Sequence, residues 1–228
     1  ADFYPGTFDG GNLFFQVVLY PEGTIEMRWG RGVPVEGASV AVGLEDFDIA
    51  IPATGEIFDA GGVTALETWP ANQCRSFLPT SSGNYTELFP PILAPTFSPA
   101  PTFFVSSCVP FIPIREIGIS IFEDDFCNEA LESVALPFSF KWRGHEVGSE
   151  YSFVTVSPNG VVFLGDAADC PVWCPYDKVS CCEAFPIGDL SGSRIPRIAI
   201  AQEDLQGDAY YASVEDAFVI SYEGVNFS

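Results

Sequence analysis

The chain has 228 residues, of which 31 are acidic and 9 are basic, so its formal net charge at pH 7 is −22. This excess of acids excludes nucleic acid and anionic membrane surfaces as expected partners, because phosphate binding requires clustered Lys and Arg. No apolar run is long enough to span a membrane. A hydrophobic content of 47%, with 21 Gly, 19 Pro and few segments of helical period, predicts a packed all-β protein.

Three strands are predicted in residues 1–78, which we assign to a first β-domain. An apolar strand over 13–20 ends at the turn Pro21-Glu22-Gly23, and a third strand is predicted over 38–44. Between them, residues 24–29 alternate in polarity. One face carries Ile25, Met27 and Trp29, and the other carries Thr24, Glu26 and Arg28.

Residues 79–102 are rich in Pro, Ser and Thr, a composition that favours extended polyproline conformations over a packed core. We interpret this stretch as a linker, either a plain spacer or one that carries O-linked glycans. The candidate O-glycosylation sites are Thr96, Ser98 and Thr102.

An apolar arm is predicted over residues 103–130. Pro110 and Pro113 exclude a central strand position, so we expect an edge strand or an extended segment. A segment this apolar is expected to be buried, either on its own domain or on that of a neighbour.

Residues 131–228 are predicted to form a second β-domain with a Cys-rich insertion over 166–188. Its clearest feature is a hairpin over 151–165, in which Pro158 presets the backbone and Asn159-Gly160 tolerates positive φ. An alternating strand over 136–140 precedes the hairpin. Further strands are predicted over 196–201, 209–212 and 217–222. Together the elements predict one or more β-sandwich domains, with a Pro-rich linker and an extended arm.

Seven cysteines indicate an oxidising, extracellular compartment. Four of them follow the spacing C-x₃-C-x₆-C-C, which lacks the paired C-x₂-C knuckles typical of zinc sites. We therefore expect disulfides, with one thiol free or paired outside this segment because the count is odd. The candidate cysteines are Cys74, Cys108, Cys127, Cys170, Cys174, Cys181 and Cys182.

Potential N-glycosylation sites agree with that compartment. Asn84 and Asn226 match the N-x-S/T acceptor pattern, and Asn72 matches the rarer N-x-C variant. Asn84 is the best candidate, because it lies in a loop-like stretch. The chain begins at Ala1 and its one methionine is Met27, so we expect a processed product or a segment of a longer protein.

Candidates for chemistry are few. His145 has no Cys or Ser nucleophile motif around it, and no phosphate-binding or zinc-protease motif occurs, so we expect neither an enzyme nor an organic cofactor. A catalytic carboxylate pair for glycoside hydrolysis could come from Asp124-Asp125, Glu203-Asp204 and Asp208, although such pairs arise by chance in an acidic chain. The acidic residues Glu203, Asp204 and Asp208 are candidates for a calcium site, because oxygen-rich loops suit this cation.

The two ends of the chain form a continuous pattern when the end is written before the beginning. The strand over 217–222 is then followed by a short loop and the strand over 13–20. The stretch from Pro158 through this join to Pro21 has the size of one β-sandwich domain.

In this rotated order, about half of the chain resembles the nidogen-like extracellular β-domain. Gln202-Glu203 departs from the family pattern, which usually has an aromatic residue there, and so does the Cys-rich insertion. The matching motifs are LPFSF at 136–140, VSPNG at 156–160 with Phe163 and Gly165, IAIAQEDL at 198–205, AYY at 209–211, FVISY at 218–222, NLFFQVVLY at 12–20 with Gly23, IEMRWG at 25–30 and VAVGLE at 40–45.

Two explanations of the rotated order remain open: a circular permutant, or one copy from a polymer in which a neighbour completes the sandwich. We favour the polymer, because unpaired sheet edges recruit matching strands. The Pro/Thr-rich stretch and the Cys-rich β-domains also resemble algal surface glycoproteins, including proteins of the hair-like mastigonemes.

These resemblances imply a structural subunit of an extracellular, glycosylated filament. Its partners would be copies of itself, joined head to tail by exchange of the arm over 103–122 or of residues 2–19. The alternative is a monomeric extracellular adhesion module that binds calcium or carbohydrate.

Overall fold

The computed structural model describes residues 13–32, 40–45, 64–66, 69–79, 85–88, 111–122, 131–142, 149–166, 196–202 and 205–227. Every regular element in these ranges is a β-strand, so the predicted all-β class is confirmed. The same ranges contain no helix that is long and apolar enough to cross a membrane.

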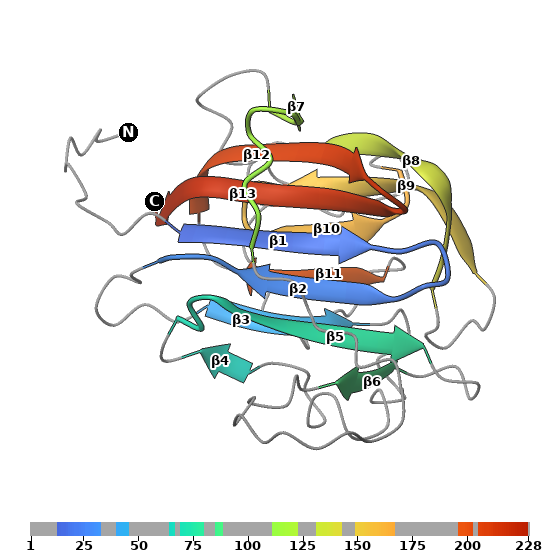
Figure 1. Ribbon diagram of the computed structural model, residues 1–228, viewed down its shortest axis with the longest axis horizontal. Coiled ribbons are helices and arrows are strands. Elements are labelled where there is room, and N and C mark those ends of the chain that lie inside the picture. The colour runs from blue at the N-terminus through green and yellow to red at the C-terminus, as the bar shows by residue number, and fades with distance from the viewer. Residues whose placement is uncertain are drawn as a thin grey trace, which may run out of the picture.

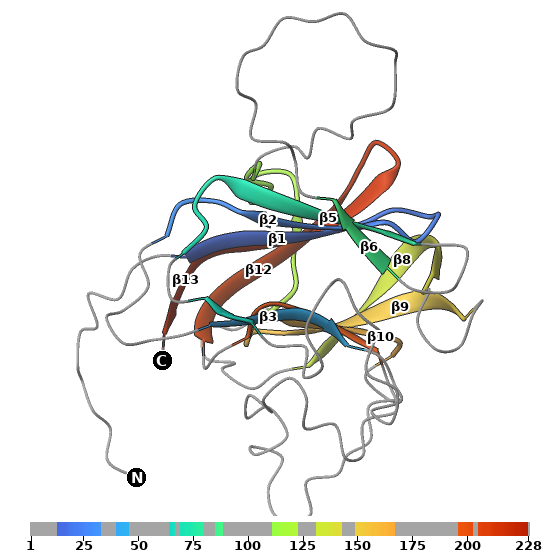
Figure 2. The same cartoon turned by 90° about the horizontal axis from the view of Figure 1, so that it is seen from below.

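The strands form two antiparallel sheets that face each other as the layers of a β-sandwich (Figures 1 and 2). The seven-stranded sheet contains, in spatial order, β6 (Tyr85–Leu88), β5 (Gln73–Pro79), β2 (Ile25–Trp29), β1 (Leu13–Leu19), β13 (Ala217–Phe227), β12 (Leu205–Val214) and β7 (Ile119–Ser120). The six-stranded sheet contains β4 (Thr64–Leu66), β3 (Val40–Glu45), β11 (Arg197–Gln202), β10 (Val161–Leu164), β9 (Glu150–Ser157) and β8 (Glu132–Lys141).

The first and last of the described strands are neighbours in the middle of the seven-stranded sheet. β1 and β13 pair antiparallel from Leu13↔Val225 to Leu19↔Phe218, which is the adjacency that the rotated order predicts. Strands from the two expected β-domains, 1–78 and 131–228, occur in both sheets and share one core. The described strands of a single chain therefore form one sandwich, in which each sheet contributes one apolar face to a shared core.

The core lies between the sheets and confirms the predicted alternation along residues 24–29. Ile25, Met27 and Trp29 are fully buried in the main apolar cluster. The Trp29 indole N–H also donates a hydrogen bond to the Ile200 carbonyl oxygen, 3.1 Å away on β11 of the opposite sheet. The hairpin predicted over 151–165 is likewise present as β9 and β10, with Gly160 at a φ of 71°.

The linker predicted over 79–102 is wrong at residues 85–88. These residues form β6, which pairs with β5 at the edge of the seven-stranded sheet. The side chain of Tyr85 is buried, and its ring centroid lies 5.2 Å from that of Trp142. Burial of this aromatic ring stabilises a strand where the composition of the stretch predicts an extended linker. Residues 80–84 and 89–102 of the stretch lie outside the described ranges.

Tyr222 links the two sheets through a buried hydroxyl. Its ring stacks on Phe15 with a centroid distance of 4.6 Å, and its O–H donates to the Ser157 carbonyl oxygen of β9 at 2.8 Å. Burial raises the pKa of Tyr222 far above its ordinary value of about 10. The folded protein therefore keeps this proton under alkaline conditions in which the unfolded chain loses it.

We expect Tyr222→Phe to change the pH dependence of stability. In the native protein the raised pKa of Tyr222 stabilises the fold fully below pH ~10, and the free energy of unfolding then falls by ~1.4 kcal/mol per pH unit above that value. The variant should lose about 1–2 kcal/mol at pH 7, because the Ser157 carbonyl loses its donor, but decline less steeply above pH ~10. Urea unfolding at pH 7 to 11, with free thiols blocked, measures both effects. Parallel declines for the two proteins would contradict the assignment.

Candidate functional site

A row of polar side chains lies on the outer face of the seven-stranded sheet and is nevertheless buried. Gln16 and Ser221 are cross-strand partners on β1 and β13, and Glu223 lies two residues further along β13. All three are at most 5% exposed. Buried polar groups require hydrogen-bonding partners, and here a segment of the same chain supplies them.

That segment is the described part of the arm, residues 111–122. Figure 1 shows it in bright green, crossing in front of the strands of the seven-stranded sheet and ending at β7. There, Ile119 and Ser120 pair with Tyr211 and Tyr210 of β12, so this part of the arm occupies a sheet edge, whereas Pro113 lies outside any strand. Residues 103–110 and 123–130 lie outside the described ranges. We call residues 111–115 the docked segment.

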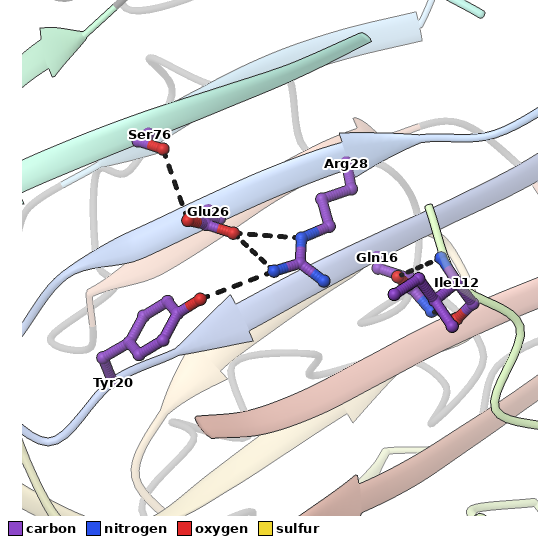
Figure 3. A network of polar contacts seen from close by, with 6 residues as sticks. All are labelled: Gln16, Tyr20, Glu26, Arg28, Ser76 and Ile112. Carbon is purple, nitrogen blue, oxygen red and sulfur yellow. Dashed lines mark hydrogen bonds and ion pairs between the residues drawn. The ribbon is translucent and has the colours of Figure 1, made fainter. Parts of the chain in front are cut away.

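Gln16 binds both main-chain polar groups of Ile112 in the docked segment. Its Oε1 accepts the Ile112 N–H at 3.3 Å, and its Nε2 donates to the Ile112 carbonyl oxygen (Figure 3). The same Nε2 donates to the Ser221 hydroxyl at 3.0 Å, which holds the amide in position. The side chain thus pairs with the arm as a neighbouring strand would.

Glu223 binds the next two main-chain donors. Its Oε1 accepts the N–H of Ile114 at 2.7 Å and that of Arg115 at 3.2 Å, and it also accepts the Ser221 hydroxyl at 2.9 Å. Hydrogen bonds to a carboxylate are stronger than those between neutral groups. Glu223 therefore fixes the register and direction of the docked segment.

Apolar contacts surround these hydrogen bonds. The side chain of Ile114 is 2% exposed and belongs to a small cluster with Val18, Tyr210, Ala217 and Val219 on the outer face of the sheet. Phe111 meets Phe14 of β1 edge to face, with ring centroids 5.9 Å apart. We call Phe14, Gln16, Ser221 and Glu223, together with this cluster around Ile114, the docking site.

Asp208, one of the three candidate calcium ligands, has protein partners in this structure. Its Oδ2 lies 2.9 Å from Arg115 Nη2 and accepts the Tyr210 hydroxyl at 3.1 Å. Burial, followed by the bond to Asp208, raises the pKa of Tyr210. Glu203 and Asp204 lie outside the described residues. Within the described ranges no three Asp, Glu, His or Cys side chains group as a metal site would require, and calcium binding stays a prediction.

A second polar network lies beside the docking site on the same face. Glu26 Oε2 and Arg28 Nη2 of β2 form a buried ion pair at 2.6 Å (Figure 3). The guanidinium also donates to the Tyr20 hydroxyl at 3.4 Å, and Ser76 donates to Glu26 Oε1 at 3.5 Å. Burial, and next the charge of Glu26, raise the pKa of Tyr20. Because every group in this network has a partner, we assign it a structural role.

The remaining candidate residues are scattered or lie outside the described ranges. Cys74 is disulfide-bonded, and no other cysteine is in the described part of the chain. Asn72 is exposed in a turn with a φ of 57°, and the Asn226 amide donates to the Gly224 carbonyl oxygen at 3.5 Å. Outside the described residues lie Cys108, Cys127, Cys170, Cys174, Cys181, Cys182, Asn84, Thr96, Ser98, Thr102, Asp124, Asp125 and His145.

Gln16 and Glu223 belong to no sequence motif that indicates a binding site. A usable signal exists at Gln16, which interrupts an otherwise apolar strand. Glu223 has no comparable signal, because an acid near the end of a strand is ordinary in a chain with 31 acidic residues.

The fold and the site together define a class of protein: a two-sheet β-sandwich that binds an extended segment of its own chain on the outer face of one sheet. No protein-family model matches the chain, and no curated protein or solved structure is significantly similar to it.

Proposed function

We propose that the protein is a structural subunit of an extracellular, glycosylated filament, in which copies join head to tail by exchanging the arm. One observation carries the proposal. The docked segment is bound by side chains from which it is separated by 93 to 109 positions in the chain. A contact made by such distant parts of a chain can form within one copy or, with the same hydrogen bonds, between two copies.

Exchange of the arm allows an open polymer. In the described part of the chain, the docking site and the docked segment are different surfaces. A contact between unlike surfaces that does not close into a ring produces a helical filament. Exchange of an identical element between copies is a known, low-cost mode of assembly, and it can preserve the hydrogen bonds of the unexchanged form.

The sequence supports the extracellular part of the proposal. Seven cysteines, among which Cys74 is disulfide-bonded, and several potential glycosylation sites suit a secreted protein. The Pro/Ser/Thr-rich residues between β6 and the arm would provide the reach that exchange requires. The resemblance to mastigoneme-type glycoproteins supports the same conclusion.

Ile114→Asp should abolish filaments, because a charge replaces a buried side chain of the docked segment. Ile117→Asp is the matched control, since Ile117 is 71% exposed on the same arm and the substitution is identical. Negative-stain electron microscopy and sedimentation of native and variant proteins make the comparison. Regular fibres from the native protein and Ile117→Asp, but compact particles from Ile114→Asp, support the proposal. Compact monomers from native material would overturn it and favour the adhesion module.

A further inference from the structure

The docking site recognises main-chain atoms of the docked segment, and it leaves none of the segment's N–H donors from 112 to 115 without a partner. Gln16 accepts the N–H of Ile112, and Glu223 accepts those of Ile114 and Arg115. Residue 113 is proline, which has no N–H and favours an extended backbone. Pro113 therefore needs no acceptor, and the site accepts the N–H groups of the residues on either side of it.

Side-chain contacts add selectivity at three of the five positions. Phe111 packs against Phe14, and a Cβ on Gly30 would come within 2.9 Å of the Phe111 ring, so glycine at that position makes room for it. Ile114 is buried, whereas Ile112 is 52% exposed. The pattern that the site accepts is accordingly aromatic, any residue, Pro, aliphatic, basic.

The site recognises residue 115 by its positive charge. The Arg115 guanidinium lies 2.9 Å from Asp208 Oδ2, and its centre lies 5.5 Å from the centroid of the Tyr210 ring. Both side chains of the ion pair are partly exposed, so this contact selects among segments more than it stabilises the fold.

We propose that the docking site is a peptide-binding site whose partner is the segment 111–115 of a second copy of this chain. This inference rests on the proposed function, because it names the segment that crosses between copies. The chain's own segment fits the site with its N–H donors from 112 to 115 paired, so the same segment from another copy satisfies the same chemistry. Two copies with a net charge of −22 each repel one another, and Arg115 brings a positive charge to the acidic partner Asp208.

A synthetic peptide tests the site without requiring assembly. The probe is residues 111–118, FIPIREIG, with blocked ends and a fluorophore, titrated into the native chain and into Ile114→Asp. The variant should bind the peptide at least about tenfold more tightly than the native chain, in which the tethered segment competes at a high effective concentration. N-methylation of residue 114 in the peptide removes the donor to Glu223 and should weaken binding at least about tenfold.

A second variant keeps the test valid if Ile114→Asp does not fold. Arg115→Asp faces Asp208 with a like charge and leaves the core untouched. It should loosen the tethered segment and bind the peptide more tightly than the native chain. A chain with both Arg115→Asp and Asp208→Arg restores an opposite-charge pair and should again exclude the peptide. The inference would be overturned if Ile114→Asp and Arg115→Asp fold but do not bind the peptide. It would also be overturned if the N-methylated peptide binds as tightly as the unmethylated one.

The two proposals fail in different ways. If the variants bind the peptide but the native protein is monomeric, the binding site is established and the filament proposal is overturned. The native protein could instead form filaments that do not bind the peptide and do not shorten when the peptide is in excess. That result would show that another segment is exchanged, and it would overturn this inference alone.

Discussion

Replacing Trp29 with alanine should lower the free energy of unfolding by about 4 kcal/mol and the melting temperature by about 10 °C. Trp29 is the largest fully buried side chain among the residues that the structure describes, so the change leaves a cavity between the two sheets. It also removes the donor to the Ile200 carbonyl oxygen, 3.1 Å away, and the ring that lies 5.8 Å from the Arg75 guanidinium. Urea and thermal unfolding, followed by circular dichroism, measure the loss.

Two variants separate the contributions to that loss. Trp29→Phe keeps an aromatic ring but lacks the indole N–H, and should cost about 2 kcal/mol. Val214→Ala, at a side chain that is 38% exposed on β12, should stay within about 0.5 kcal/mol of the native protein. If Trp29→Ala were no more destabilising than Val214→Ala, the placement of Trp29 at the centre of the sandwich would be wrong.

Gly160→Ala should destabilise the fold by about 3 kcal/mol for two separate reasons. The backbone at Gly160 has a φ of 71°, which strains any residue with a Cβ. In addition, the new Cβ would come within 2.4 Å of the Ala201 carbonyl oxygen on the neighbouring strand. The Gly160 carbonyl oxygen accepts the Ile200 N–H at 3.1 Å, so a shift of the turn to relieve the contact would weaken this bond too.

The exposed residue Ser152 on β9 provides the control for this substitution. Ser152→Ala adds no strain and should change the free energy of unfolding by less than about 0.5 kcal/mol. Urea unfolding of both variants at pH 7 makes the comparison. A Gly160→Ala protein as stable as Ser152→Ala would contradict the geometry of the turn.

The turn at Gly160 illustrates how much of this fold could be predicted. The residues Pro158-Asn159-Gly160 predict a turn with positive φ, because the preference is local. Two other features depend on contacts with a different strand: the approach to Ala201, and the hydrogen bond at 3.0 Å from the Leu205 N–H to Asn159 Oδ1. No spacing in the sequence reveals them.

The arm and its docking site differ in the same way: local sequence predicts the arm, whereas the docking site depends on contacts between distant strands. The prolines and the apolar composition of 103–122 predict a buried segment in an edge or extended position. β7 occupies an edge, but both of its residues are exposed, and within 111–122 only Ile114 and Ile121 are buried. The identity of its partners could not be predicted, because Gln16 and Glu223 belong to strands at opposite ends of the sequence. β6 was missed for a related reason, since its four residues are stabilised by burial of Tyr85 rather than by local composition.

The sequence by itself determined the all-β class, the faces of individual strands and the positions of the main turns. These properties follow from alternation and turn chemistry, which act over a few residues. Only the tertiary structure decided that Glu26 and Arg28 are buried on the outer face, that β1 lies beside β13, and that a carboxylate on β13 holds the arm. Each of these depends on which distant segments meet, and that is set by the closure of the whole sandwich.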